Sequence, residues 1–373
     1  MKSIGIILAG GNNNRIGRLS DKRAIAALPV AGSYRAIDFT LSNMSNSRVS
    51  KVAVLPQFNA RSLNEHLSSS KWWDFGRKQG GLYVFTPTVT KNNNSWYQGT
   101  ADALYQNIDF LKKSHEPYVI IATGDGVYKM DYGKVLEAHI AKNADITVVY
   151  TTLKDTDDDL TRFGVLKLDE NERIVEFEEK PLVASSNNVS IGVYVIRRRH
   201  LIEILERCAR EDRHDFVQDV LVRYRNVRKI YGYKLDTYWR NIATVDSYYK
   251  TNMDFLKKDV RDYFFKQYPD VYSKVDDLPP AKYNPGSQVR NSLVSSGCIV
   301  NGVVENSVIF KKSYIGNNCV IKNSIILNDV YIGDNTHIEN CIVESRDTIR
   351  ANSYFVGEGE VKIVVERNER YVI

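Results

Sequence analysis

An aliphatic side chain recurs at almost every sixth position in the C-terminal part of the chain. The repeat slips once by one residue, after Ile321, and its members are Val303, Ile309, Ile315, Ile321, Ile326, Ile332 and Ile338. Short strands joined by Asn, Asp and Gly turns at this period are typical of a hexapeptide β-helix, in which each coil buries one aliphatic side chain per face. A run of ordinary hairpins is the alternative, but so many in-phase aliphatics rarely arise by chance. We expect Cys298, Cys319 and Cys341 to fill the same interior.

Before this repeat, from the start of the chain to about Leu256, strand-like and helix-like patterns alternate. The expected strands are 4–8, 51–54, 118–122, 145–150 and 189–196, and the expected helices are 60–66, 101–111, 132–139, 201–207 and 245–256. Apolar strands that alternate with amphipathic helices imply an α/β domain with a largely parallel sheet covered on both faces. Ligands of such sheets bind outside the carboxyl ends of the strands.

A proline-rich segment separates these two parts. Residues 276–286 read Asp-Asp-Leu-Pro-Pro-Ala-Lys-Tyr-Asn-Pro-Gly, a composition that continues neither a helix nor a central strand. A chain of 373 residues also exceeds one ordinary core. We therefore predict a first domain at residues 1–256, a linker at 257–288 and a β-helix domain at 289–373.

The composition restricts the class of protein. The chain is 43% hydrophobic and 26% charged, and no apolar stretch reaches the ~20 residues that span a bilayer. No signal peptide opens it, and Cys208 and the three cysteines of the repeat lack Cys-x-x-Cys spacing, which favours reduced thiols over a disulfide or a zinc site. The net charge of +6 suits anionic small molecules and does not by itself indicate nucleic acid. We expect a cytoplasmic protein without a nucleic-acid or membrane partner.

The first candidate site is a glycine-rich loop. Residues 8–17 read Leu-Ala-Gly-Gly-Asn-Asn-Asn-Arg-Ile-Gly and follow the first expected strand, the layout that cradles phosphates with backbone N–H groups. Gly10 and Gly11 allow a tight turn, the asparagines at 12–14 tolerate left-handed backbone, and Arg15 adds a positive charge. A plain turn between a strand and a helix is the alternative interpretation.

A second candidate segment spans residues 96–103. Its two aromatic residues could stack on a base, and Gly99 and Thr100 can cap a helix that begins at Ala101. The alternative is a capped helix with packed aromatic side chains.

Three later segments place polar groups at strand ends and before a helix. Asp125 follows the expected strand 118–122 beside flexible glycines and is well placed to hold a divalent metal. Glu179 and Lys180 could bind sugar hydroxyls and phosphate, although a solvated turn is the alternative at both places. The last segment, 238–244, lies just before a helix.

Taken together and in this order, the segments resemble those of the sugar-phosphate nucleotidyltransferases, specifically the ADP-glucose pyrophosphorylases (glucose-1-phosphate adenylyltransferases) of glycogen and starch synthesis. The strings at 34–39, 41–43, 128–132 and 162–164 and the C-terminal repeat extend the resemblance over essentially the whole chain. It implies a Rossmann-like nucleotidyltransferase domain followed by a left-handed parallel β-helix. It also implies a reaction in which glucose 1-phosphate attacks the α-phosphorus of ATP, with two carboxylates holding Mg²⁺ and basic side chains neutralising charge.

The resemblance assigns roles to residues at matching positions. A nucleotide-binding remnant would comprise Gly10, Gly11, Arg15, Gln98, Gly99 and Thr100. A sugar-phosphate site would comprise Gly164, Glu179, Lys180, Ser190 and Asp215. Asp125 would be the remaining metal-binding carboxylate.

Three departures from the family pattern affect the catalytic charges. The family loop Gly-Gly-x-Gly-Thr-Arg-Leu carries asparagines at 12–14 here, the Arg-Ala-Lys-Pro segment has Ile25 in place of lysine, and the Tyr-Trp-Arg-Asp segment has Asn241 in place of the second metal-binding carboxylate. Gly126 also replaces the histidine that follows the first carboxylate. Loss of one such charge-stabilising group commonly lowers the rate by about 10²–10³. We therefore expect no intact catalytic set and no productively bound metal in this chain.

The resulting hypothesis is a non-catalytic or weakly catalytic subunit that resembles the regulatory, GlgD-type members of the family. Its expected partner is a catalytic subunit that binds Mg²⁺, in a mixed tetramer on which it acts allosterically. One alternative is an active adenylyltransferase that uses Lys22, Arg23 or Arg15, and another is a sensor that binds a sugar phosphate or a nucleotide. Lys22 and Arg23, or the arginine run 197–199, could bind a phosphorylated effector, although a solvated basic face is the simpler interpretation of the run.

Overall fold

The computed structural model describes residues 2–11, 14–76, 80–89, 95–153 and 159–366. The chain forms two compact units, each of which combines segments that are distant in sequence. The first unit consists of Met1–Gly11 and Phe39–Trp239, and the second consists of Asn12–Asp38 and Arg240–Ile373. The segment that follows the glycine-rich loop therefore belongs to the same unit as the C-terminal repeat. The domain boundaries at 256 and 289 stay predictions.

The helices and the strands before the repeat have the following bounds. The helices are α1 (Ala36–Asn46), α2 (Arg61–Leu67), α3 (Thr100–Gln106), α4 (Ile108–Lys112), α5 (Tyr132–Ala141), α6 (Arg198–Arg210), α7 (Val245–Asp254) and α8 (Lys258–Phe265). Short 3₁₀ turns span Asn14–Ser20, Ile25–Ala27, Ser70–Trp73 and Leu160–Arg162, and a π-helical turn spans Val217–Val222. The strands are β1 (Ser3–Ala9), β2 (Pro29–Val30), β3 (Tyr34–Arg35), β4 (Lys51–Pro56), β5 (Gly81–Val84), β6 (Tyr118–Thr123), β7 (Gly126–Tyr128), β8 (Ile146–Thr152), β9 (Gly164–Leu168), β10 (Ile174–Glu179), β11 (Asn188–Arg197), β12 (Ile230–Lys234) and β13 (Trp239–Asn241).

A nine-stranded sheet forms the centre of the first unit, in the order β10-β9-β11-β6-β1-β4-β5, with β8 paired to β11 and β12 paired to β8. Strands β10 and β11 run against the other strands, so the prediction of a mostly parallel sheet is confirmed. Because β1, β4 and β6 are parallel neighbours, their carboxyl ends meet at one edge. The residues that follow these ends, Gly10, Gln57 and Asp125, are thereby placed at the same edge.

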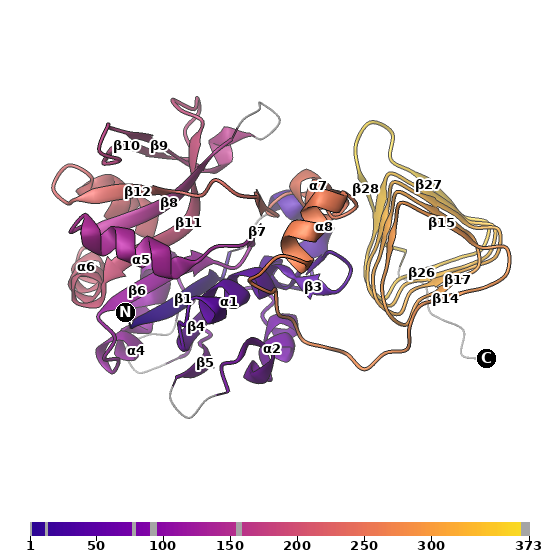
Figure 1. Cartoon of the computed structure of the whole chain (residues 1–373), viewed down its shortest axis with the longest axis horizontal. Coiled ribbons are helices and arrows are strands. Elements are labelled where there is room, and N and C mark those ends of the chain that lie inside the picture. The colour runs from indigo at the N-terminus through magenta and orange to yellow at the C-terminus, as the bar shows by residue number, and fades with distance from the viewer. Residues whose placement is uncertain (1, 12–13, 77–79, 90–94, 154–158, 367–373) are drawn as a thin grey trace. The chain divides into compact units, whose positions relative to one another are not determined.

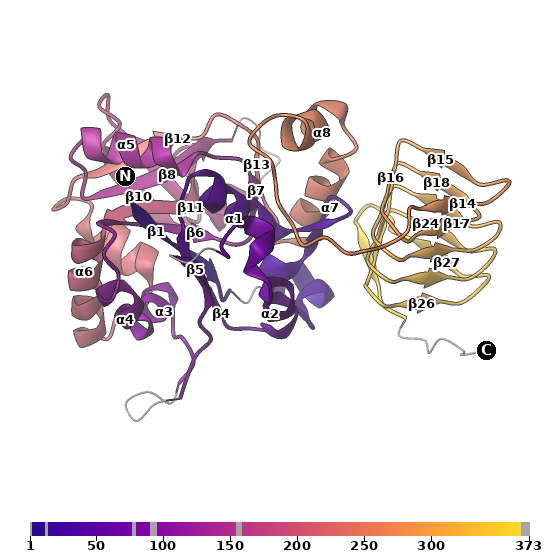
Figure 2. The same cartoon turned by 60° about the horizontal axis from the view of Figure 1, so that its bottom comes forward.

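Helices cover both faces of this sheet. Alternate residues of a strand point to opposite faces, and β8 shows this alternation. Ile146 and Val148 belong to the core cluster beneath α6, whereas Thr147 bonds to His139 of α5 on the other face. Figure 2 shows α5 and α6 on opposite sides of the strands.

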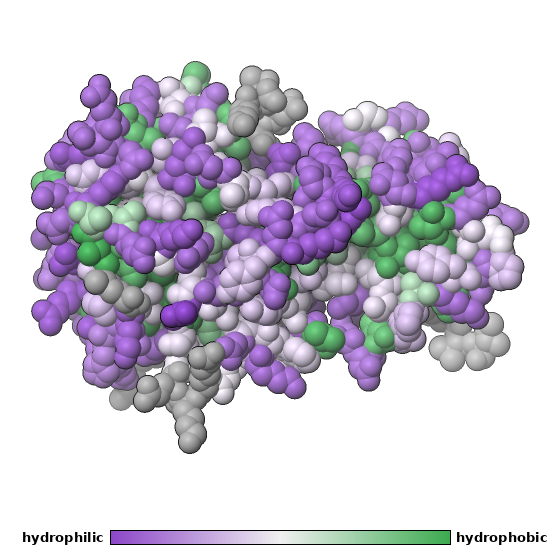
Figure 3. Space-filling model, viewed as in Figure 1, coloured by the Kyte–Doolittle hydropathy of each residue, from purple (hydrophilic) through white to green (hydrophobic). Residues whose placement is uncertain are grey.

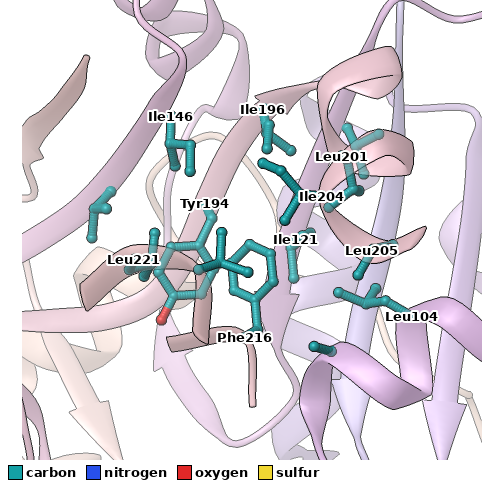
Figure 4. Close-up of a cluster of buried hydrophobic side chains, with 14 of the residues drawn as sticks. Leu104, Ile121, Ile146, Tyr194, Ile196, Leu201, Ile204, Leu205, Phe216 and Leu221 are labelled. Atoms are coloured by element: carbon teal, nitrogen blue, oxygen red, sulfur yellow. The ribbon is translucent and has the colours of Figure 1, made fainter. Parts of the chain in front are cut away.

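The core beneath α6 supports the predicted sugar-phosphate region. Figure 4 shows Leu201, Ile204 and Leu205 of α6 directed toward Ile121 and Ile196 of the sheet. In the same cluster, the rings of Tyr194 and Phe216 lie side by side with their centroids 5.3 Å apart. The π-helical turn that follows Phe216 is therefore anchored on a rigid apolar layer.

Most of the expected helices are present, but one is interrupted. The expected helix 101–111 forms two helices, α3 and α4, with a break at Asn107. The Asn107 side chain donates to the carbonyl oxygen of Ala103 and to the hydroxyl of Tyr97, each at 2.9 Å, and its backbone leaves the helical region. Side-chain bonds of this kind compete with the helical ladder.

The C-terminal part is a left-handed parallel β-helix, as predicted. Its strands form three five-stranded parallel sheets, which Figure 1 shows as the faces of a triangular solenoid and Figure 2 as stacked coils. They are β14 (Lys282–Tyr283), β15 (Gln288–Arg290), β16 (Leu293–Val294), β17 (Ile299–Val300), β18 (Val303–Glu305), β19 (Val308–Ile309), β20 (Tyr314–Ile315), β21 (Val320–Lys322), β22 (Ile325–Ile326), β23 (Tyr331–Ile332), β24 (His337–Glu339), β25 (Cys341–Val343), β26 (Thr348–Ile349), β27 (Tyr354–Val356) and β28 (Lys362–Val364).

The interior of the β-helix confirms the six-residue repeat, with one correction. Six of the predicted aliphatics and Cys298, Cys319 and Cys341 belong to its core cluster. Val303 does not, because it occupies the outward register position beside Gln288 and Val320. Val304 takes the interior position and is fully buried. The repeat therefore begins at Val304, five residues before Ile309. This is the same one-residue slip that occurs between Ile321 and Ile326.

One sheet of the β-helix is covered by the rest of the second unit. The outward-facing side chains of Val308, Ile325 and Ile342 are fully buried although they lie outside the solenoid core. Tyr249 of α7 donates to the carbonyl oxygen of Asn323 at 2.7 Å. Further contacts, described below, come from the segment 14–38.

The remaining surface of the β-helix is mixed. Figure 3 shows apolar side chains among polar ones on its visible face, and the exposed large side chains of its strands include Ile299, Tyr331 and Tyr354. Across the described ranges, no helix combines the length and the apolar character needed to cross a membrane.

Candidate functional site

The carboxyl ends of β1 and β4 bring the glycine-rich loop against Gln57. A Cβ atom at residue 10 would lie 3.3 Å from the Cβ atom of Gln57 and 3.4 Å from the carbonyl oxygen of Leu55. Oε1 of Gln57 is buried and accepts no hydrogen bond from the residues that the structure describes. A buried acceptor without a partner costs free energy, so this edge favours a ligand that can donate to it. Asn12 and Asn13 lie outside the described residues.

Asp125 lies at the same edge, in the turn after β6. Gly124 fixes this turn by donating its N–H to the carbonyl oxygen of Leu8 at 3.0 Å, and Asp125 is half-buried. A Cβ atom at residue 126 would lie 2.9 Å from a ring carbon of Tyr128. The local packing therefore requires glycine where the family has histidine, unless Tyr128 moves.

Trp239 contributes a second buried polar atom to this region. Its Nε1 lies 3.6 Å from the position that a Cβ at Gly126 would take, and its ring meets Phe163 edge-on at 5.4 Å. Nε1 is buried and donates to no residue within the described ranges. Among the residues that the structure describes, a donor at Trp239 and an acceptor at Gln57 thus lack protein partners, and both belong to the same unit.

The segment 96–103 divides into structural and exposed residues. Tyr97 is buried and donates to the carbonyl oxygen of Phe85 at 2.9 Å, so it is a packing residue. Trp96 is 63% exposed, stacks on Phe58 with the rings nearly parallel, and is the aromatic residue of the pair that could meet a base. The Gln98 side chain is exposed.

The expected cap at this helix start is present at Gly99, but the helix begins one residue earlier than expected. Helix α3 begins at Thr100, Gly99 is its N-cap, and no side chain caps it. Oγ1 of Thr100 instead accepts the N–H of Phe216 at 2.8 Å. A Cβ at Gly99 would lie 2.4 Å from the carbonyl oxygen of His214, so glycine is needed for this close approach. Both residues join the helix to the segment that carries Asp215.

Strands β9 and β10 bring Gly164 and Glu179 together. The two residues are opposite each other in the antiparallel register, and Oε2 of Glu179 lies 3.1 Å from the position of a Cβ at Gly164. Oε1 of Glu179 forms an ion pair with Nζ of Lys180 at 3.2 Å. Burial raises the pKa of the Glu179 carboxyl, and the Lys180 charge opposes this shift. Lys180 itself is exposed, with a positive φ of 50°, and can present its charge to a ligand.

Ser190 and Asp215 join this group through Tyr194. The Ser190 hydroxyl lies 3.5 Å from the Tyr194 hydroxyl, and a bulge after Ser190 places Gly192 against Thr123 of β6. Burial raises the pKa of Tyr194, and the charges of Glu179 and Asp215 add to this effect. Asp215 also accepts the N–H of Gln218 at 2.8 Å, which fixes the start of the π-helical turn. The predicted sugar-phosphate residues are therefore gathered on one wall of the first unit.

The predicted catalytic positions of the second unit do not offer the expected charges. Ile25 lies in a 3₁₀ turn and is 7% exposed, so its place is an apolar one. Oδ1 of Asn241 accepts the N–H of Ala243 at 2.9 Å and thereby serves a local turn. Arg15 is exposed at the start of the 3₁₀ turn Asn14–Ser20.

Arg23, two residues before Ile25, is bound to the β-helix. Its Nη2 lies 2.5 Å from Oε1 of Glu344, and its Nη1 donates to Oγ of Ser345 at 3.0 Å. The side chains of Arg23 and Glu344 are 13% and 9% exposed. A guanidinium held in this way is not available to a nucleotide phosphate.

The residues present do not make a two-carboxylate magnesium site. Asp125 supplies one carboxylate, but the matching position holds an amide whose oxygen already accepts a backbone hydrogen bond. No cluster of three His, Cys, Asp or Glu side chains that could hold a metal occurs among the described residues. A neutral amide oxygen lacks the charge that favours Mg²⁺.

Sequence reasoning missed Gln57, Tyr194 and the pairing of Arg23 with Glu344. Gln57 could have been found from its place three residues after the expected strand 51–54. Tyr194 is inside a strand and reads as a core residue. Arg23 and Glu344 are separated by 321 positions, and no local signal connects them.

Comparison with known proteins agrees with this architecture. The nucleotidyl transferase family matches residues 4–258, and the GlmU-like C-terminal hexapeptide family matches residues 279–362. A glucose-1-phosphate adenylyltransferase of Pseudothermotoga lettingae is 39% identical over 320 residues, which cover 85% of this chain and 76% of the relative. Proteins of the same name from Clostridium acetobutylicum and Clostridium novyi are 39% and 37% identical over 318 and 319 residues, covering 84% of this chain and 83% of each relative.

Proposed function

We propose that this chain, which belongs to the nucleotidyl transferase family and to its glucose-1-phosphate adenylyltransferases, is a regulatory subunit with little or no catalysis of its own. Its partner would be a catalytic adenylyltransferase subunit that makes ADP-glucose from ATP and glucose 1-phosphate. The observation that carries the proposal is that neither Ile25 nor Arg23 offers an available positive charge in place of the family lysine. Ile25 is buried, and the neighbouring Arg23 is committed to Glu344.

The active-enzyme alternative needs a substitute cation at this place. Of Arg15, Lys22 and Arg23, Arg23 is the nearest to Ile25 in the sequence, and its ion pair with Glu344 removes it from consideration. Isoleucine offers nothing to a triphosphate, and an amide at 241 holds Mg²⁺ less well than a carboxylate. These losses need not add, but together they favour a chain with a strongly reduced rate.

The predicted sugar-phosphate residues that gather around Glu179 support the proposal that this chain still binds a sugar phosphate. Lys180 is exposed for a phosphate, and Glu179, Ser190 and Asp215 supply acceptors for hydroxyl groups. A subunit that binds the sugar phosphate without catalysing its reaction is suited to sense the substrate and to shift the conformation of a partner.

A mixing experiment tests the proposal. The purified chain is added in increasing ratio to a catalytic adenylyltransferase subunit from the same organism, and the rate of ADP-glucose formation is recorded with and without candidate effectors. We expect a changed kcat, substrate affinity or effector response that saturates at a fixed ratio. An unchanged rate and response, with no co-elution of the two proteins, would contradict a regulatory role.

A further inference from the structure

The backbone on either side of Asp215 is hydrogen-bonded to the start of α3. The carbonyl oxygen of His214 accepts the N–H of Ala101 at 2.7 Å. On the other side, the N–H of Phe216 donates to Oγ1 of Thr100 at 2.8 Å. Both partners belong to the first turn of the helix, so the segment that carries Asp215 is fixed to α3 at two points.

Asp219 also holds Asp215, from within the π-helical turn that follows. Oδ2 of Asp219 accepts the N–H of Asp215 at 2.9 Å. In return, the backbone N–H of Asp219 donates to the carbonyl oxygen of Asp215, also at 2.9 Å. Asp219 thus closes a hydrogen-bonded ring on a single residue. Turns of the π-helical type are frequent at functional sites, which draws attention to this one.

Arg213 holds the second oxygen of the Asp219 carboxylate. Nη1 of Arg213 lies 3.0 Å from Oδ1 of Asp219, whose side chain is 17% exposed. Nε of Arg213 meets Oε2 of Glu211 at 3.2 Å, and Arg223 pairs with the same oxygen. The hydrogen bond from Arg223 lowers the pKa of the Glu211 carboxyl, which therefore stays ionised at neutral pH. The four side chains form a chain of alternating charge that begins at Asp219.

This chain of charges is better suited to orientation than to stability. Ion pairs between partly exposed side chains contribute little to folding, because water and salt screen them. Charge-assisted hydrogen bonds nevertheless have a defined geometry. Here that geometry is imposed on Asp219, the acceptor of the Asp215 N–H. We therefore expect its main effect on the position of Asp215.

One oxygen of the Asp215 carboxylate remains for a ligand. Oδ1 accepts the N–H of Gln218 at 2.8 Å, whereas Oδ2 accepts no hydrogen bond from the residues that the structure describes. Burial raises the pKa of Glu179 and of Tyr194, and the Asp215 charge adds to both shifts, so Asp215 lies near the other predicted sugar-phosphate residues. A carboxylate that is fixed at its backbone and at one oxygen can present the other oxygen to a hydroxyl group.

We propose that Asp219 and Arg213 are positioning residues of the sugar-phosphate site. They fix Asp215 through its N–H, so that the second oxygen of its carboxylate meets a hydroxyl group of the sugar. The ligand class is a hexose phosphate, with glucose 1-phosphate as the member to be tested. This assignment rests on the proposed binding of a sugar phosphate by this chain. It adds to that site an ion pair that does not itself touch the ligand.

Calorimetry with glucose 1-phosphate tests the assignment. We expect Asp219→Ala and Arg213→Met each to weaken binding about tenfold. Asp219→Asn keeps an acceptor for the Asp215 N–H and should lose less, and Arg213→Lys keeps the charge and should bind more tightly than Arg213→Met. Glu206→Gln is the matched control, because it removes a carboxylate from an exposed ion pair between α6 and Lys112, and it should keep the original affinity.

A second background separates positioning from a general structural effect. Asp215→Asn keeps an oxygen for the Gln218 N–H but removes the charge that would meet the sugar. If Asp219 acts through Asp215, Asp219→Ala should cause no further loss of affinity in this background. If Asp219→Ala does not fold, Arg213→Met is compared in the two backgrounds instead. Equal losses of affinity with and without the Asp215 charge would overturn the proposal.

The same measurements separate this assignment from the proposed function. If the unchanged chain does not bind glucose 1-phosphate, or if Asp215→Asn binds it as tightly as the unchanged chain, the sugar-phosphate site is wrong and the assignment is wrong with it. If Asp215→Asn binds weakly while the Asp219 and Arg213 variants bind normally, the site stands and only the positioning role is overturned.

Discussion

The carboxylate of Glu179 lies directly over Gly164, with Oε2 only 3.1 Å from where a Cβ at residue 164 would be. Ring atoms of Phe177 approach the same position to 2.8 Å. Because residue 164 has no side chain, the Glu179 carboxylate can occupy this position. Because Lys180 pairs with Glu179, the position of the predicted phosphate-binding cation depends on the same contact.

Gly164→Ala should therefore weaken binding of glucose 1-phosphate. The added methyl group has to displace Phe177 or Glu179, and we expect a loss of about tenfold to a hundredfold in affinity, together with about 1–3 kcal/mol of stability from overpacking. Calorimetry and thermal unfolding measure the two effects. Gly76→Ala is the control, since an added Cβ there would meet its nearest neighbour at 3.9 Å. Equal affinity in the Gly164 variant and the unchanged protein would show that this wall does not bind the sugar phosphate.

Restoring the family lysine alone should destabilise the protein. Ile25 is 7% exposed, so Ile25→Lys forces an ammonium group into an apolar place at a cost of about 2–4 kcal/mol. Ile25→Met conserves volume and polarity and should cost less than about 1.5 kcal/mol. Urea unfolding compares the two. If the lysine variant were as stable as the methionine variant, the position would be open to solvent and the apolar description of this segment would be wrong.

A combined repair should restore some activity in spite of that cost. Ile25→Lys with Asn241→Asp returns one cation and one carboxylate, and each such group commonly contributes about 10²–10³ in rate. We expect a measurable gain in ADP-glucose formation per folded molecule, enhanced by changes at Asn12–Asn14. Asn241→Asp alone is the control. No gain in any combination would place the catalytic lesion elsewhere in the chain.

The buried His139 should make the protein acid-sensitive over a defined window. Burial lowers the pKa of His139 from 6.5 to about 4, and the charges of Arg197 and His200 act in the same direction against that of Asp145. Between these values the unfolded chain binds a proton at His139 and the folded chain does not. Stability is therefore complete above pH 6.5 and falls as the pH drops toward 4, by up to about 3 kcal/mol from this group.

Unfolding free energies at a series of pH values test this dependence. His139→Gln should show a shallower loss between pH 6.5 and 4 than the unchanged protein. His115→Gln changes an exposed histidine and should keep the original slope. Identical slopes for the unchanged protein and the His139 variant would contradict the assignment.

The β-helix was readable from the sequence because its signal is local. Each coil repeats within a short stretch, so the interior positions recur in phase and only Val303 was assigned to the wrong side. Helix α1 was missed for the opposite reason. Its buried face includes Thr40 and Asn43, which bond to the carbonyl oxygens of Thr123 and Tyr128, and these polar residues break the apolar period.

The sequence pointed to the residues of the candidate site, but not to the contacts that they make in the folded chain. Matching segments pointed to Glu179, Ser190 and Asp215, and the fold gathers them around Tyr194. Whether Arg23 is available to a ligand depends on its contact with Glu344, which lies 321 positions away in the sequence. No reading of local spacing gives that pairing, because it arises from the way segment 14–38 packs on the solenoid.

Turnover by the purified chain alone is the most direct measurement of the central claim. ADP-glucose formation from ATP, glucose 1-phosphate and Mg²⁺ is recorded beside a catalytic relative at equal concentration, with both proteins shown to be folded. Loss of the lysine and of one carboxylate predicts a kcat at least about 10³-fold below that of the relative. A kcat within tenfold of the relative would contradict the account.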